Sequence, residues 1–299
     1  MGLVSRASTA LRVPVAALRA QQVVGAVQSM RPGDTTVVIV ATLISARLAQ
    51  PVGLGLMDVA LVAIANGFLC AASMAFNDWH DVREDTINEP TRPIVAGRIG
   101  RSAVLQLASA LSLLGVVIAW TAPGWRYGAV AVGVVGASVA YSMRLKSIPL
   151  VGNITTAIVA GFPFWCWLLW EVEPLRLYLP LCLVVLADRF GAEVIKTSED
   201  VRGDRMSDID TVATRWGPVR AMALGCASLV LAAMAAWWPV VAGGADPVYV
   251  FWTVGVTLLL AITCALPMVR ALPVEVVARD VVRLHRIGIG IAVVGLLLV

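Results

Sequence analysis

Nine stretches of this sequence are apolar and long enough to cross a lipid bilayer as a helix, and they constrain the fold more than any other feature. A membrane-spanning helix needs about 20 mostly apolar residues. The stretches lie at residues 35–52, 57–76, 103–122, 127–143, 151–170, 177–196, 219–241, 248–269 and 284–299. The strict polar–apolar alternation of a membrane β-barrel strand does not occur in them. We therefore predict an all-α membrane protein with nine transmembrane helices.

The composition excludes other classes of protein. Hydrophobic residues make up 59% of the chain and charged residues only 14%. Soluble domains have about 45–50% apolar and about 25% charged residues, so a soluble enzyme, a disordered chain and a fibrous repeat are excluded. The net charge of +4 is modest and gives no sign of nucleic-acid binding. The five cysteines stand singly in apolar stretches, which indicates buried small side chains rather than a metal site.

Basic residues are distributed unevenly between the two sides of the predicted helices. Most of them lie in the N-terminal segment and in the loops after the second, fourth, sixth and eighth stretches. Because positively charged loops stay in the cytoplasm, we predict a protein of the cytoplasmic membrane with its N-terminus inside and its C-terminus outside. Residues 1–30 contain arginines and no acid, which predicts an amphipathic helix on the inner leaflet. Residues 31–299 then form one polytopic domain.

Most of the 19 acidic residues lie in two short regions, 78–89 and 188–210, at the predicted cytoplasmic ends of helices. If each region is a continuous helix, Asp78, Asp81 and Asp85 share one face, and so do Lys196, Asp200 and Asp204. Gly203 weakens the helix in the second region. Like charges repel strongly near a membrane, and Mg²⁺, which prefers carboxylate, water and phosphate oxygens, would neutralise them. A solvated, charged loop is the alternative for either region alone.

Basic residues stand beside these acids. Arg92 follows the first region, Lys146 lies after the fourth stretch, and Lys196 begins the acidic part of the second region. Carboxylates that hold a metal, together with arginine and lysine donors, are suited to binding a diphosphate. The chain has no GxxxxGK[ST] motif, so a nucleoside triphosphate is not indicated.

At these residues the sequence resembles the intramembrane prenyltransferase (UbiA) family. The family's first signature, NDxxDxxxD, is met by Asn77, Asp78, Asp81 and Asp85, and the second, KxxxDxxxD, by Lys196, Asp200 and Asp204. Further matches are Asn88, Pro90, Arg92, Pro93, Ile94, Gly97, Ile99, Tyr141, Ser142, Lys146, Gly152 and Asn153. The chain departs from the family at Ala192 and Thr197, which affects the subfamily rather than the chemistry. The resemblance covers nearly the whole chain.

The resemblance implies nine helices around a central cavity that is open to lipid, with an Asp-rich cytoplasmic cap. It implies Mg²⁺-dependent transfer of a prenyl group from an allylic prenyl diphosphate to a small-molecule acceptor, by ionisation to an allylic cation. The expected metal ligands are Asp78, Asp81, Asp85, Asp200 and Asp204, and Lys196 joins them as a catalytic residue. The expected substrate-binding residues are Asn77, Arg92, Tyr141, Lys146, Asn153, Asp188 and Glu193. We expect an aromatic acceptor, with a glyceryl phosphate-type acceptor as the alternative.

Besides Lys196 at its end, the stretch 177–196 contains three charged residues, Asp188, Arg189 and Glu193, at positions where charge is costly and usually functional. Adjacent helical positions point in different directions, so we expect Asp188 and Arg189 to find partners on other helices rather than to pair with each other. Asp188 or Glu193 is expected to contact the acceptor or the allylic cation.

Two other functions remain as alternatives. In a terpene cyclase of the same family, an alkene of the prenyl chain itself attacks the cation, so no acceptor is needed. In a divalent-cation transporter, the acids would form an ion path. That class predicts acids deep in several helices, whereas here they gather at helix ends on one side.

Overall fold

The fold of this chain is given by a computed structural model that describes residues 15–121, 124–173, 175–243, 247–269 and 273–295. The long helices are α1 (Val15–Ser29), α2 (Pro32–Ala49), α3 (Leu56–His80), α5 (Arg101–Thr121), α6 (Trp125–Met143), α9 (Leu175–Met206), α11 (Pro218–Ala236), α13 (Pro247–Val269) and α14 (Val274–Gly295). The short ones are α4 (Val82–Asn88), η1 (Leu145–Ser147), α7 (Val151–Ala160), α8 (Phe162–Trp165), η2 (Cys166–Leu169), α10 (Val212–Trp216) and α12 (Trp238–Val241). The prediction of an all-α protein is confirmed.

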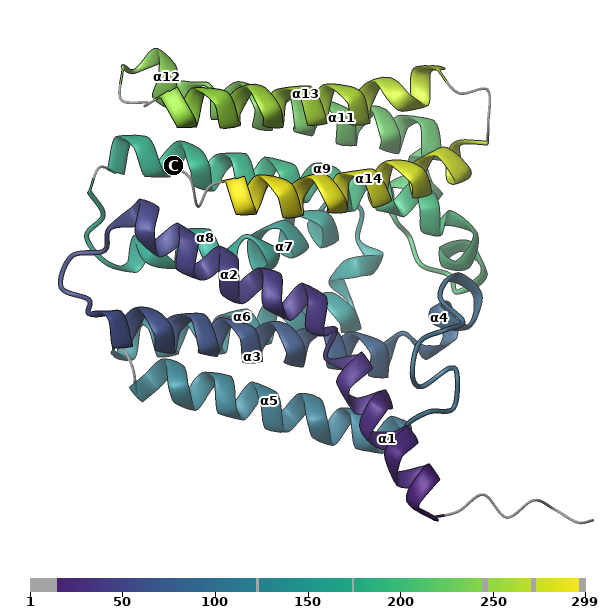
Figure 1. The fold of residues 1–299 in the computed structure, drawn as a ribbon. Coiled ribbons are helices and arrows are strands. Elements are labelled where there is room, and N and C mark those ends of the chain that lie inside the picture. Colours follow the sequence, from purple (N-terminus) through teal and green to yellow (C-terminus); the bar gives the residue numbers. More distant parts are fainter. Residues whose placement is uncertain (1–14, 122–123, 174, 244–246, 270–272, 296–299) are drawn as a thin grey trace, which may run out of the picture.

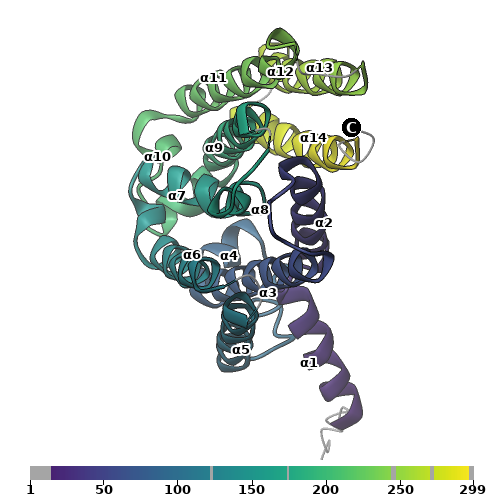
Figure 2. The same ribbon diagram turned by 90° about the vertical axis from the view of Figure 1, so that its left-hand side faces the viewer.

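Most of the long helices run alongside one another, and α4 lies at one end of the bundle (Figure 1). Viewed from its left-hand side, the bundle shows α2, α3, α6, α7, α9 and α14 around a common centre (Figure 2). Helix α5 packs on the outside of α3, and α11 packs on the outside of α9. Helix α1 projects away from the bundle in both views, and its role as an interfacial helix stays a prediction.

Five of the described helices are long and apolar enough to cross a membrane: Pro32–Ala49, Leu56–His80, Arg101–Thr121, Pro218–Val241 and Pro247–Ala265. A sixth candidate is the pair Val151–Ala160 and Phe162–Leu169, which meet at a bend of 51°. The predicted count of nine is not confirmed. Charges within α9 and α14 lower their hydropathy, and residues 296–299 of the predicted ninth span lie outside the described residues.

Glycines allow α9 and α11 to pack with their backbones in contact. A Cβ atom added to Gly225 of α11 would lie 2.7 Å from the carbonyl oxygen of Gly191, and one added to Gly191 of α9 would lie 2.8 Å from the carbonyl oxygen of Gly225. Small residues at helix contacts are typical of membrane proteins, because close approach maximises van der Waals packing. This contact fixes α9, which carries the second acidic region.

We expect Gly225→Ala to lower the free energy of unfolding by about 1–3 kcal/mol, because the new methyl group has no space and the helices must separate. The matched control is Gly255→Ala on α13, where no atom lies within 4 Å of the added Cβ. Thermal unfolding in detergent, measured on both variants, checks this. Equal unfolding midpoints for the two variants would contradict the close packing of α9 on α11.

Candidate functional site

One cavity of about 550 Å³ lies among the helices that surround the centre of the bundle. Its charged end lies where α3 gives way to α4 and where α9 ends, and we call this end the rim. The rest of the cavity extends between apolar side chains, which include Val38, Leu69, Val134, Phe162, Phe164 and Leu181. The cavity therefore joins a charged end to an apolar interior.

The first acidic region is not one continuous helix, because α3 ends and α4 begins at Asp81. Asp81 has φ −88° and ψ 21° and lies at the junction of both helices. The face that Asp78, Asp81 and Asp85 would share in an unbroken helix is therefore interrupted. Asp81 and Asp85 line the cavity, and Asp78 does not.

Asp78 is instead buried, with its side chain only 1% exposed, and it holds two arginines. Its Oδ1 accepts a hydrogen bond from Arg31 Nη2 at 2.7 Å and lies 3.6 Å from Arg92 Nη1. Both arginines line the cavity. In this geometry Oδ1 of Asp78 orients Arg31 and Arg92, because a buried carboxylate pairs with nearby cations. Its Oδ2 is buried without a hydrogen-bond partner among the described residues, and the role of Asp78 as a metal ligand stays a prediction.

Asp81 contacts two positively polarised partners at the rim. Its Oδ1 accepts a hydrogen bond from Lys146 Nζ and lies 2.8 Å from His80 Nδ1. Burial would raise the pKa of Asp81, but the His80 hydrogen bond and the Lys146 charge outweigh it and hold the pKa below its usual value. Lys146 Nζ also donates to Glu84 Oε1 at 2.9 Å. Asp81 is therefore ionised and directed towards the cavity.

The second acidic region is helical to its end, since α9 continues through Gly203 to Met206. Gly203 packs directly on the side-chain amide of Asn88, so a side chain there would collide with the last residue of α4. Lys196 Nζ lies 3.8 Å from Asp200 Oδ2, and Thr211 Oγ1 donates to Asp204 Oδ2 at 3.3 Å. This packing brings both acidic regions to the same rim.

Asp81, Asp85, Asp200 and Asp204, which we call the rim carboxylates, are only partly compensated by neighbouring cations. Burial, opposed by Arg92 and assisted by neighbouring carboxylates, raises the pKa of Asp85 to about 7. Burial and the charge of Asp200 raise the pKa of Asp204 to about 7. Asp85 Oδ2 is buried and has no hydrogen-bond partner among the described residues. A dication between these groups would satisfy that oxygen and reduce the repulsion.

The arrangement fits a metal that takes part of its ligands from a substrate. Within the described ranges, no three carboxylate, imidazole or thiol side chains are close enough to hold an ion by themselves. Mg²⁺ usually takes one or two carboxylates and completes its shell with water and phosphate oxygens. The rim carboxylates therefore fit Mg²⁺ bound together with a diphosphate better than a metal caged by protein.

Asp188 and Arg189 pair with each other, contrary to our expectation. Arg189 Nη2 and Nε donate to Asp188 Oδ2 at 2.6 and 2.9 Å. His285 Nε2 of α14 lies 3.1 Å from Asp188 Oδ1. The argument from helical directions failed because the long arginine side chain folds back to its neighbour. The expected partner on another helix is present, since His285 contacts Asp188 and also lies 3.4 Å from Arg189 Nη2.

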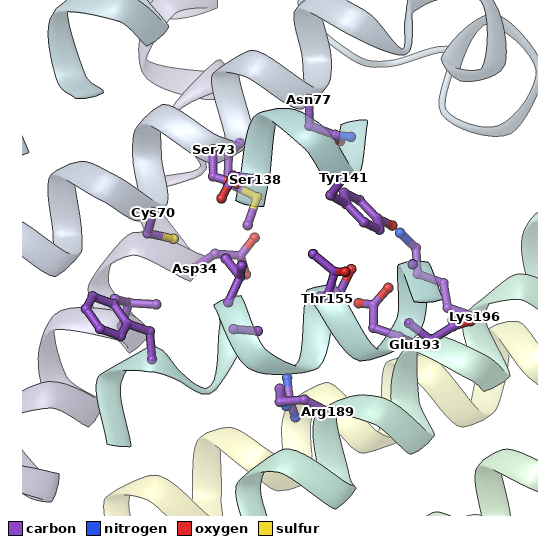
Figure 3. A pocket seen from close by; sticks show the side chains of 18 of the residues that line it. Asp34, Cys70, Ser73, Asn77, Ser138, Tyr141, Thr155, Arg189, Glu193 and Lys196 are labelled. Atoms are coloured by element: carbon purple, nitrogen blue, oxygen red, sulfur yellow. The ribbon is translucent and has the colours of Figure 1, made fainter. Parts of the chain in front are cut away.

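The other predicted substrate-binding residues all line the cavity: Asn77, Arg92, Tyr141, Lys146, Asn153 and Glu193. In Figure 3 the hydroxyl end of Tyr141 lies next to the amine of Lys196, and Glu193 lies near Lys196. Cavity residues that sequence reasoning missed include Arg31, Asp34 and Glu84. Glu84 lies within the first acidic region but outside the helical spacing of Asp78, Asp81 and Asp85. Arg31 and Asp34 lie outside both acidic regions, and an acid in the first turn of a helix, such as Asp34, is explained equally well by the helix dipole.

The sequence model described as the UbiA prenyltransferase family matches residues 38–271. The digeranylgeranylglyceryl phosphate synthase of Methanoregula boonei is 32% identical over 220 residues, which cover 70% of this chain and 76% of that protein. The bacteriochlorophyll synthase 33 kDa chain of Rhodobacter capsulatus is 32% identical over 183 residues, which cover 57% of this chain and 59% of that one.

Solved structures show the same fold. A UbiA homolog from Aeropyrum pernix superposes with a TM-score of 0.68 at 21% identity, covering 86% of this chain and 97% of that one. A UbiA homolog from Archaeoglobus fulgidus, bound to DMAPP and Mg²⁺, superposes with a TM-score of 0.65 at 14% identity, covering 89% of this chain and 99% of that one.

Proposed function

Because the chain belongs to the UbiA prenyltransferase family and is an integral membrane prenyltransferase, we propose that it transfers the prenyl group of an allylic prenyl diphosphate to a glyceryl phosphate-type acceptor. The observation that carries the proposal is a cavity that joins a rim of carboxylates and cations to an apolar interior. A prenyl diphosphate has the same division, with a charged head and an apolar tail.

The relatives favour a glyceryl phosphate-type acceptor over the aromatic one that we expected from the sequence. Three of the similar proteins are named digeranylgeranylglyceryl phosphate synthase and are 31–34% identical to this chain. We assign the two aspartate motifs to the prenyl diphosphate, which enzymes with either kind of acceptor use, so these motifs carry no information about the acceptor.

In the proposed mechanism, the rim carboxylates Asp81, Asp85, Asp200 and Asp204 would hold Mg²⁺. When bound, Mg²⁺ neutralises the diphosphate and so makes it a better leaving group. Lys146 and Lys196 donate to diphosphate oxygens from opposite sides of the cavity. Arg31 and Arg92 do the same from the orientation that Asp78 imposes on them.

The remaining parts of the cavity serve the prenyl chain. Its hydrocarbon tail lies among the apolar side chains beyond the rim, where it is protected from water. Tyr141 lines the cavity next to Lys196, and its ring is placed to stabilise the allylic cation. The acceptor attacks this cation and loses a proton. In the predicted orientation the rim faces the cytoplasm.

Purified protein incubated with Mg²⁺ and geranylgeranyl diphosphate tests the proposal. We expect an ether-linked product, identified by mass spectrometry, when geranylgeranylglyceryl phosphate is added, and little product with homogentisate. Prenylated homogentisate as the main product would contradict the glyceryl phosphate-type acceptor. A cyclic hydrocarbon or alcohol formed without any acceptor would indicate a terpene cyclase instead.

A further inference from the structure

Just inside the rim, the cavity wall carries a polar layer that the binding of a prenyl diphosphate does not use. We define this layer as Asp34 of α2, Ser138 of α6, Thr155 of α7 and Glu193 of α9, all of which line the cavity. Figure 3 shows Asp34, Ser138, Thr155 and Glu193 around the same open space. They come from four different helices, so the layer surrounds the cavity rather than marking one helix face.

The spacing along the helices places this layer next to the diphosphate site. Glu193 precedes Lys196 by three residues on α9, which is about 4.5 Å along a helix axis. Asp34 lies one turn beyond Arg31, at the start of α2. Both carboxylates are therefore about one helical turn from cations that we assign to the diphosphate. The reacting carbon of a prenyl diphosphate is bonded directly to a diphosphate oxygen. With the diphosphate at the rim, this carbon would therefore lie at the depth of the polar layer.

All four side chains of the polar layer offer hydrogen-bond acceptors. Ser138 Oγ donates to the carbonyl oxygen of Val134 at 2.9 Å, and Thr155 Oγ1 donates to that of Val151 at 2.8 Å. Their hydroxyl protons are therefore used within their own helices, and only oxygen lone pairs face the cavity. Ionised carboxylates accept and do not donate. In the part of the chain that the structure describes, neither Asp34 nor Glu193 forms a hydrogen bond or a close ion pair. Arg189 interacts electrostatically with both carboxylates, and Lys196 does so with Glu193.

Oxygens of this layer that form no hydrogen bond with the protein can accept one from a ligand that brings donors. The hydrocarbon chain of a prenyl diphosphate has no N–H or O–H group, so it gains nothing from these oxygens. An acceptor with free hydroxyl groups does supply donors, and a hydroxyl oxygen that attacks a carbocation must also lose its proton. Carboxylates are the usual acceptors of such a proton.

We propose that Asp34 and Glu193 bind the hydroxyl group of the acceptor and that this carboxylate pair takes up its proton. The bond between the first prenyl carbon and the diphosphate oxygen breaks, and its electron pair leaves with the diphosphate. A lone pair of the acceptor hydroxyl oxygen then forms the new carbon–oxygen bond. The hydroxyl proton passes to a carboxylate oxygen of Asp34 or Glu193 and later to water. This inference rests on the proposed function and adds to it the residues that bind the acceptor hydroxyl and take up its proton.

The variants Asp34→Asn and Glu193→Gln test this, because they keep the shape of each side chain but remove the basic oxygen. With Mg²⁺, geranylgeranyl diphosphate and geranylgeranylglyceryl phosphate, two products are quantified: the ether and geranylgeraniol, which forms when water captures the cation. We expect the alcohol-to-ether ratio to rise about tenfold or more in each variant. The ratio does not depend on the amount of folded protein, so a partly misfolded variant still gives an answer.

Glu199→Gln is the matched control, since this glutamate lies on the same helix but pairs with Arg279 at 3.3 Å and does not line the cavity. Its ratio should equal that of the wild-type chain. An unchanged ratio in either test variant would overturn the role of that residue, and equal losses of both products would overturn the proton transfer. If the wild-type chain releases diphosphate but forms no ether, the proposed acceptor fails and this inference fails with it.

Discussion

Replacing Asp81 or Asp200 with asparagine is expected to lower prenyl-transfer turnover by about a hundredfold or more, which corresponds to about 2.7 kcal/mol of lost transition-state stabilisation. Each substitution removes one negative charge from the rim and leaves the size of the side chain unchanged. Asp81 is also the partner of Lys146, and Asp200 is the partner of Lys196, so each variant frees a lysine from its carboxylate. Turnover is measured with saturating Mg²⁺ and geranylgeranyl diphosphate.

Asp210→Asn is the control for this prediction. Asp210 is an acid near the same end of α9, but its side chain is 48% exposed and it pairs with Arg215 at 3.1 Å, away from the cavity. We expect its turnover to stay within about a factor of two of the wild-type value, because exposed ion pairs contribute little. Size-exclusion profiles should be the same for all three variants. Turnover near the wild-type value in Asp81→Asn or Asp200→Asn would refute the assignment of metal binding to these carboxylates.

The rim was predictable from sequence because its residues repeat at helical intervals. Lys196, Asp200 and Asp204 occur every four residues, and α9 is helical through all three. Asp81 and Asp85 carry the same signal and also reach the cavity. Residues four apart on one helix share a face regardless of how that helix packs against the rest of the chain, so this feature can be predicted from the local sequence.

Asp78 shows where that signal stops. Its spacing from Asp81 is equally regular, but the helix breaks at Asp81. Its carboxylate instead pairs with Arg31, which lies far upstream in the sequence, and with Arg92, which lies downstream of α4. Such pairing depends on tertiary structure. Asp34 was missed for the same reason, because only the arrangement of α2 against the other helices places a first-turn acid in the wall of the cavity.

The nine apolar stretches of the sequence do not all appear in the structure as long, uniformly apolar helices, so the count of nine spans stays a prediction. The apolar stretch 151–170 reads as one continuous helix, yet the chain bends by 51° between α7 and α8. Gly161 at that bend and Pro163 in the following turn interrupt regular helix formation. The charged pair Asp188 and Arg189 lowers the hydropathy of α9, although this helix forms part of the cavity wall.

Replacing Asp188 with alanine is expected to have the largest effect on stability, lowering the free energy of unfolding by about 3–5 kcal/mol. The Asp188 side chain is 7% exposed and is held between Arg189 on its own helix and His285 of α14, whose side chain is 4% exposed. Without the carboxylate, the partly buried charge of Arg189 loses its close ion-pair partner, which accepts two hydrogen bonds from it. His285 also loses its partner across the contact between α9 and α14.

Glu199→Ala is the matched control, because Glu199 also joins α9 to α14, through an ion pair with Arg279, whose side chain is 54% exposed. Water compensates for the loss of such a pair, so we expect a change below about 1 kcal/mol. Unfolding midpoints in detergent, measured without substrate, separate the two variants. The double variant Asp188→Ala/Arg189→Leu should regain part of the lost stability, since it removes the uncompensated charge. Equal destabilisation by Asp188→Ala and Glu199→Ala would mean that burial does not strengthen the contact between Asp188 and its partners.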